Sequence, residues 1–186
     1  MLRAVTLVVM LLGSYSTIAR DTELKLYRPF GEATQQAPII VQKEISGQCW
    51  QQSQRIKRED AWRCIADGKV YDPCFVKQYG SRTEAICPHS PWMGASIKIN
   101  LTSAVDNSLN IELNMAEAYP WAVELTTGEK CQAVDEGGSY DGMPIHYQCD
   151  SQTVLLGHMQ RCKPEWSILQ RTPEGVSTAL VAKAWF

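Results

Sequence analysis

The stretch DAWRCIADGKVYDPCF (60–75) decides the fold prediction, because it combines two cysteines with a turn signal. The Asp-Gly pair at 67–68 lies between two runs that contain β-forming residues, which predicts a hairpin with a two-residue turn. Such a turn sets Cys64 opposite Tyr71 and leaves Cys74 out of register with Cys64. We therefore expect the two cysteines of this stretch to pair with cysteines outside it and not with each other.

The chain has seven cysteines, and no two of them have the C-x-x-C spacing of a zinc ribbon or a thioredoxin-like redox site. Disulfides are therefore favoured over metal ligation, and no metal is expected. Spacing alone does not fix the connectivity, but antiparallel neighbours favour the pairs Cys49–Cys64, Cys74–Cys87 and Cys131–Cys149. Each bridge contributes about 2–4 kcal/mol, mainly by restricting the unfolded chain. Cys162 is left as the candidate free thiol, available for a bridge between two chains.

The first nineteen residues read as a secretory signal peptide. Arg3 precedes an apolar run over 4–12, and small residues follow up to Ala19. This run is much shorter than the roughly 20 residues that a membrane-spanning helix needs. No second run of membrane length follows, so we expect no transmembrane segment in the mature chain and a periplasmic or extracellular location. Residues 20–41 read as an extended linker, and 42–186 as one domain.

Short apolar segments separated by turn residues predict the fold class. Ile97, Ile99 and Leu101 alternate with polar residues, which is typical of a half-buried strand. The last third of the chain repeats such segments with glycines between them, which favours an antiparallel meander. We therefore predict a mainly β protein: a single small antiparallel barrel or sandwich stapled by disulfides.

The charge balance and the absence of known catalytic motifs exclude several classes of function. The chain has eighteen Lys and Arg residues and twenty Asp and Glu residues, so it lacks the excess of positive charge that is typical of nucleic-acid-binding proteins. No G-x-S-x-G, H-E-x-x-H or phosphate-binding glycine loop occurs, and we expect neither catalytic residues nor a cofactor. His158 and Cys162 raise the weaker hypothesis of a thiol enzyme or hydrolase. His89 and His146 are isolated, and a zinc site joining them to His158 is disfavoured.

The acidic, glycine-rich loop at 135–142 is the best candidate for recognition, because binding residues often lie on loops held by a rigid scaffold. Its order of acids does not match an EF-hand, and whether it binds a cation stays open. Most of the six tryptophans are expected in the core. Trp92, in a proline-flanked turn, is the one expected to be exposed. The candidate recognition residues are Trp92, Asp135, Glu136, Tyr140 and Asp141.

Seven short motifs occur along the chain from residue 47 to its end: G-x-C-W (47–50), D-A-W-R-C (60–64), D-P-C-F (72–75), C-P (87–88), P-W-A-V-E-L-x-x-G-x-x-C (120–131), D-G-M-x-I-x-Y-x-C (141–149) and A-W-F (184–186). Together they resemble a family of exported bacterial proteins with no known activity. The resemblance implies bacterial origin, export and one domain, and it carries no catalytic residue over to this chain.

The expected function is that of an exported, non-catalytic structural or protein-interaction component of a bacterial cell-envelope assembly. Its partners would be other envelope proteins. The alternative is a secreted binding or inhibitory module for a glycan, a small ligand or a foreign hydrolase.

Overall fold

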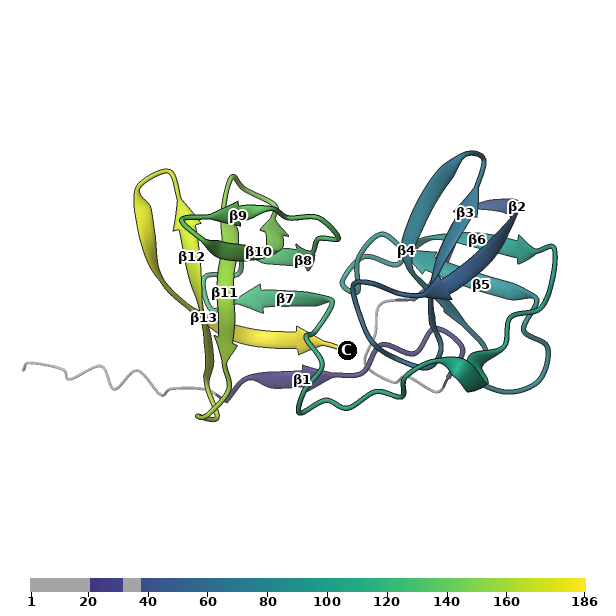
Figure 1. Ribbon diagram of the computed structural model, residues 1–186, viewed down its shortest axis with the longest axis horizontal. Helices are drawn as coiled ribbons and strands as arrows, with labels where there is room; N and C mark the ends of the chain where they lie inside the picture. The colour runs from purple at the N-terminus through teal and green to yellow at the C-terminus, as the bar shows by residue number, and fades with distance from the viewer. Residues whose placement is uncertain (1–20, 32–37) are drawn as a thin grey trace, which may run out of the picture.

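The computed structural model describes residues 21–31 and 38–186. The predicted signal peptide and part of the predicted linker lie outside these residues. The described chain folds into two closed β-barrels that lie side by side (Figure 1). The predicted mainly β, disulfide-linked barrel is confirmed, but the strands divide between two barrels where one was expected.

The N-terminal barrel has five strands in sequential order, and the parallel pairing of its first and last strands closes it. This closure explains why a second barrel exists: once the first and last strands have paired, the sheet has no free edge to which later strands can add. The strands are β2 (Ile40–Gln52), β3 (Ala61–Ala66), β4 (Lys69–Val76), β5 (Glu84–Pro88) and β6 (Ala95–Leu101).

The C-terminal barrel has the order β13-β12-β11-β10-β8-β7, and antiparallel pairing between β13 and β7 closes it. The two-stranded pairing of β9 with β10 extends from it. A 3-10 helix, η1 (Asn107–Leu109), lies on the connector between the barrels. The strands are β7 (Ala122–Leu125), β8 (Lys130–Ala133), β9 (Ser139–Tyr140), β10 (Met143–Cys149), β11 (Val154–Gln160), β12 (Trp166–Thr172) and β13 (Gly175–Trp185).

The predicted hairpin is present between β3 and β4. Asp67 and Gly68 form its turn with φ angles of 49° and 72°, and Cys64 lies opposite Tyr71. Positive φ at both positions matches the right-handed twist of the flanking strands, which is why Asp-Gly suits this turn. The register that the sequence predicted is confirmed.

All seven cysteines lie in the described part of the chain, and six form the three expected bridges. Cys49–Cys64 joins β2 to β3, Cys74–Cys87 joins β4 to β5, and Cys131–Cys149 joins β8 to β10. Each bridge therefore links neighbouring strands within one barrel. Cys162 is free and exposed.

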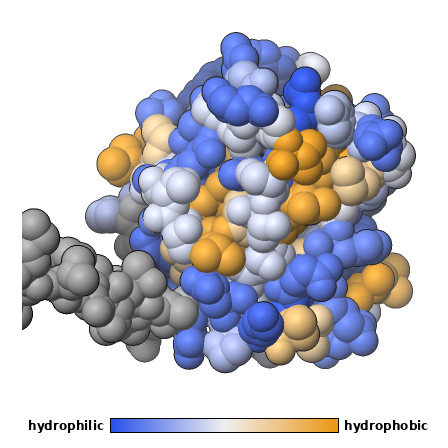
Figure 2. Space-filling model, turned by 90° about the vertical axis from the view of Figure 1, so that its left-hand side faces the viewer, coloured by the Kyte–Doolittle hydropathy of each residue, from blue (hydrophilic) through white to orange (hydrophobic). Residues whose placement is uncertain are grey.

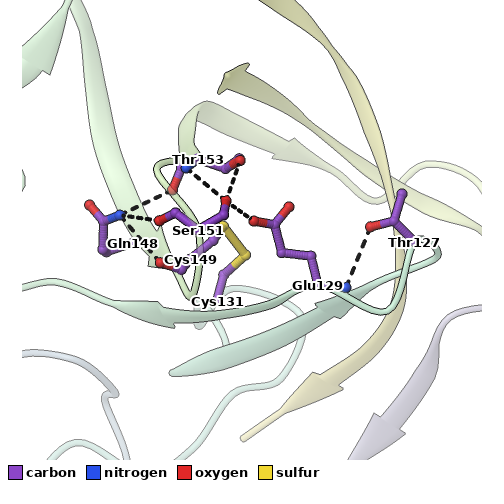
Figure 3. The surroundings of a disulfide bond; sticks show 7 residues. All are labelled: Thr127, Glu129, Cys131, Gln148, Cys149, Ser151 and Thr153. Atoms are coloured by element: carbon purple, nitrogen blue, oxygen red, sulfur yellow. Dashed lines mark hydrogen bonds between the residues drawn. A yellow bond between two sulfur atoms is a disulfide. The ribbon is translucent and has the colours of Figure 1, made fainter. Parts of the chain in front are cut away.

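The Cys131–Cys149 bridge lies beside a polar turn that follows β10 (Figure 3). Ser151 donates its hydroxyl hydrogen to Glu129, and its oxygen accepts from the Thr153 hydroxyl at 2.8 Å. The Gln148 side chain donates to the main-chain oxygens of this same turn. These bonds order the chain around the disulfide.

The described part of the predicted linker is packed against the C-terminal barrel. Strand β1 (Glu23–Lys25) pairs in parallel with the last residues of β13. Tyr27 is 3% exposed, and its ring packs against Phe75 of the N-terminal barrel and Trp121 beside β7. Burial raises the pKa of Tyr27 to about 12. This segment therefore contacts both barrels.

Arg58, on the loop between β2 and β3, is fully buried at the inter-barrel interface. Its guanidinium forms an ion pair with Asp60 and donates to the main-chain oxygens of Tyr27 and Phe186. The same group lies over the Phe75 ring, 4.6 Å from the ring centroid. One hydrophobic cluster also runs across the interface, from Phe75 to the residues of the C-terminal barrel. This cluster therefore joins the two barrels, while the N-terminal barrel also has a separate cluster of its own that includes Val76 and Ile99.

Candidate functional site

Two of the candidate recognition residues, Trp92 and Asp135, lie at the inter-barrel interface. Trp92 is partly buried and packs edge-on against Trp185, with 5.5 Å between ring centroids, and the Lys130 ammonium lies 5.6 Å from its ring. Asp135 accepts a bond of 2.8 Å from Arg55 Nε and lies 3.5 Å from Arg63. Trp92 is thus near the start of β8 and Asp135 just beyond its end, and both help to join the barrels.

The other three candidate residues, Glu136, Tyr140 and Asp141, are exposed on the C-terminal barrel. Tyr140 belongs to β9, opposite Met143, and the Arg171 guanidinium lies 4.7 Å from its ring centroid. The structure therefore separates the five predicted residues into an interface pair and an exposed group. No cluster of three or more metal-ligating side chains occurs among the described residues, those of this loop included.

Beside Tyr140 a groove of about 570 Å³ crosses β10, β11 and β12. We call it the outer groove. Figure 2 looks onto the C-terminal barrel and shows hydrophobic residues gathered in the middle of this face, with hydrophilic residues around them. Apolar atoms dominate the groove surface. Its lining includes Met143, Pro144, Gly157 and Leu169, together with the polar residues His158, Gln160, Ser167 and Thr178.

Gly157 forms part of the outer groove because β11 is irregular at this point. Its φ is 63°, and the pairing of β11 with β12 shifts register between Leu156 and Gln160, the stretch that contains Gly157. A glycine within a strand often marks such a bulge, because a residue with a side chain is disfavoured at positive φ. The sequence TVLLGHMQ contained this signal, but the groove itself depends on neighbouring strands that the sequence did not place.

His158 and Cys162 do not form a hydrogen-bonded pair in the described structure. His158 Nδ1 lies 3.1 Å from the Tyr119 hydroxyl, and Cys162 is exposed. Arg161, which lies between His158 and Cys162 in the sequence, contacts two aromatic rings. Its guanidinium carbon lies 5.1 Å from the ring centroid of Tyr119 and 4.8 Å from that of Trp166. This stretch therefore fastens the connector onto the C-terminal barrel.

The three histidines do not converge. His146 stacks on Tyr119 with 4.8 Å between ring centroids, so Tyr119 contacts both His146 and His158. His89 follows β5, in the other barrel, and its main-chain N–H bonds to Ala95. The pairing of His146 and His158 through Tyr119 was not predicted, because Tyr119 lies on a connector whose path the sequence did not indicate.

A carboxylate, Asp72, lies partly buried between β4 and the loop after β2. It accepts hydrogen bonds from the Ser53 hydroxyl and from the Gln54 main-chain N–H, the latter at 3.0 Å. Burial raises the pKa of Asp72, and the nearby Asp135 carboxylate acts in the same direction, while the two hydrogen bonds oppose the shift. Asp72 positions the loop that carries Arg55 toward the C-terminal barrel.

Comparison of the chain with protein-family models, curated proteins and solved structures finds no match. Within residues 21–31 and 38–186, no helix has the length and apolar character needed to cross a membrane.

Proposed function

We propose that this protein is an exported, non-catalytic structural or protein-interaction component of a bacterial cell-envelope assembly. The observation that supports this best is the outer groove, an apolar surface with polar residues at its margin on a disulfide-linked scaffold. Protein interfaces commonly combine an apolar centre with a polar rim. Other envelope proteins are the proposed partners.

The disulfides support export. Such bonds persist in the periplasm, on cell surfaces and outside cells, and are rare in reducing cytoplasm. Three bridges in one short chain are consistent with an oxidising compartment. The apolar leader and the resemblance to exported bacterial proteins point in the same direction.

The rigidity of the scaffold supports a binding role for its surface. The closed barrel and the Cys131–Cys149 bridge, which joins β8 to β10, hold β10, β11 and β12 in position. Binding to a surface that is already ordered loses less conformational entropy than binding to a flexible one. Tyr140, which stands beside the groove on β9, would add an aromatic contact of the kind enriched at interfaces.

Site-specific photocrosslinking in intact cells of the native bacterium tests the proposal. A photoreactive amino acid replaces Leu169 or Thr178 in the outer groove, and in the control it replaces Val70, which is 48% exposed on the N-terminal barrel. We expect both groove positions to crosslink to the same envelope protein in stoichiometric amount, and the Val70 position not to do so.

A different result would redirect the assignment. If neither groove position gives a crosslink while free protein accumulates in the medium, the envelope role is wrong and the secreted binding module is favoured. Equal crosslinking from Val70 would show that the contact is not specific to the groove.

A further inference from the structure

A cavity of about 290 Å³ opens at the inter-barrel interface and shares no lining residue with the outer groove. We call it the interface cavity. The loop after β2 contributes Arg55 and Lys57, β10 contributes His146, and the connector contributes Glu117 and Tyr119. Its volume is near the lower limit for small-molecule sites, so it suits a small ligand.

One nitrogen in the cavity wall lacks a hydrogen-bond partner. His146 Nε2 is buried and unbonded among the described residues. Stacking on Tyr119, with an angle of 21° between the rings, fixes the orientation of the imidazole. Buried polar atoms are nearly always hydrogen-bonded, so Nε2 is a position where a ligand atom would complete the pattern. Burial, and then the proximity of His158, lowers the pKa of His146, so a neutral imidazole with one N–H donor is favoured.

The charged side chains of the interface cavity favour an anion. Arg55 uses Nε for its bond to Asp135, which leaves its terminal nitrogens outside that bond. Lys57 donates to the main-chain oxygen of Ser53 at 3.1 Å, and no carboxylate of the described residues lies within ion-pair distance of it. Arg55 is already ion-paired with Asp135, whereas Lys57 has no such partner among the described residues, and Glu117 is the carboxylate of the lining. The donors that remain for a ligand are the Lys57 ammonium and the terminal nitrogens of Arg55.

We propose that the interface cavity binds a small monocarboxylate, held by Lys57 and Arg55 and hydrogen-bonded to His146 Nε2. A planar carboxylate fits the guanidinium geometry, and a dianion would bring excess charge close to Glu117. The alanine and valine side chains at 118, 133 and 134 provide an apolar wall for a short carbon chain. The carboxylate belongs either to a free organic acid or to the end of a peptide. This inference does not depend on the outer groove or its partner.

Nuclear magnetic resonance titration of the oxidised mature protein tests the proposal through the His146 side-chain nitrogens and the Tyr119 ring. The probes are propionate, acetyl-alanyl-glycine with a free carboxylate, the amide of that peptide, phosphate, and chloride at equal ionic strength. We expect saturable shifts with a carboxylate probe and none with the amide or chloride. Lys57→Gln is expected to weaken binding at least about tenfold, because it removes a charge-assisted hydrogen bond.

His146→Phe keeps an aromatic ring against Tyr119 and removes Nε2, so it should weaken binding similarly, read from the Tyr119 ring. Lys69→Gln, at the exposed hairpin turn, is the matched control and should leave affinity unchanged. Saturation by propionate alone supports a free acid as the ligand, and saturation by the peptide alone supports a peptide carboxylate. The proposal is wrong if neither saturates below about 50 mM, if phosphate binds as tightly, or if Lys57→Gln has no effect.

Discussion

At the scale of single residues, Arg58 links the two barrels through hydrogen bonds and an ion pair that are buried at their interface. All three of its guanidinium nitrogens have acceptors, although the residue is fully buried. A buried charge is tolerated when its donors are all bonded, whereas removing one partner leaves the other charge uncompensated. The interface is therefore sensitive to substitution at this position.

We expect Arg58→Met to lower the free energy of unfolding by about 3–5 kcal/mol, because it leaves the Asp60 carboxylate buried without its partner. Urea denaturation measures this change. The double variant Arg58→Met/Asp60→Leu should be less destabilised than the single one, since it removes both charges. A loss below about 1 kcal/mol for the single variant, as is typical of exposed ion pairs, would contradict this account.

Asp72 should make the free energy of unfolding depend on pH in the direction opposite to that expected for an ordinary ion-paired carboxylate. Burial raises the folded-state pKa of Asp72 above its usual 3.8, so the folded state binds more protons than the unfolded state. Its contribution to stability is therefore fully present below pH 3.8 and is lost as the pH rises through the folded-state pKa.

Asp72→Asn removes this titration, so stability relative to the wild type should increase as the pH rises above the usual Asp72 pKa of 3.8 and through its higher folded-state pKa. Urea denaturation of both proteins at several pH values measures the difference. A difference that stays constant with pH would contradict the assignment.

At the scale of elements, the features that the sequence predicted are those decided by neighbouring residues. The hairpin at Asp67-Gly68 and the three disulfides follow from turn chemistry and adjacent strands. The parallel pairing of β2 with β6 was not predictable, because the sequence of neither strand indicates which strand it pairs with. Trp92 was expected to be exposed, yet it is partly buried, because Trp185, far along the chain, covers it. Likewise only part of the candidate loop borders the outer groove.

Gly157 is the residue of β11 where substitution should cost most through the backbone. Gly157→Ala is expected to lower the free energy of unfolding by about 1–2 kcal/mol, because alanine is strained at positive φ. A Cβ atom here would meet only the Met143 sulfur, at 3.9 Å, so the cost is conformational and not a clash.

Gly68→Ala, in the exposed hairpin turn with nothing within 4 Å, provides the control for strain alone. Denaturation by urea should give similar losses for the two variants. A much larger loss for Gly157→Ala would mean that the bulge is also held by tight packing.

At the scale of the whole molecule, the two barrels should behave as one folding unit. The main hydrophobic cluster contains Ile56 and Phe75 from the N-terminal half together with Leu125 and Val181 from the C-terminal barrel. A second cluster lies within the N-terminal barrel, but the main cluster spans the interface, and we expect it to couple the unfolding of the two barrels.

Scanning calorimetry should therefore give one transition, with equal calorimetric and van't Hoff enthalpies. Replacing Cys131 and Cys149 by alanine removes a bridge across 18 residues of sequence, and should lower stability by about 3 kcal/mol. The transition should shift to lower temperature without splitting. Two resolved transitions in either protein would contradict this coupling.

The pairing of β1 with β13 has a consequence for the order in which the chain can fold during its synthesis. β1 is the first described strand to leave the ribosome, and its hydrogen-bonding partner, β13, is the last. The N-terminal barrel, whose strands are consecutive, can close while synthesis continues, because domains generally fold as they emerge. The segment before it must wait, with Tyr27 and its apolar neighbours uncovered, until β13 has been synthesised. During that interval the nascent protein carries an unmatched strand, and a holding chaperone would have a defined segment to shield.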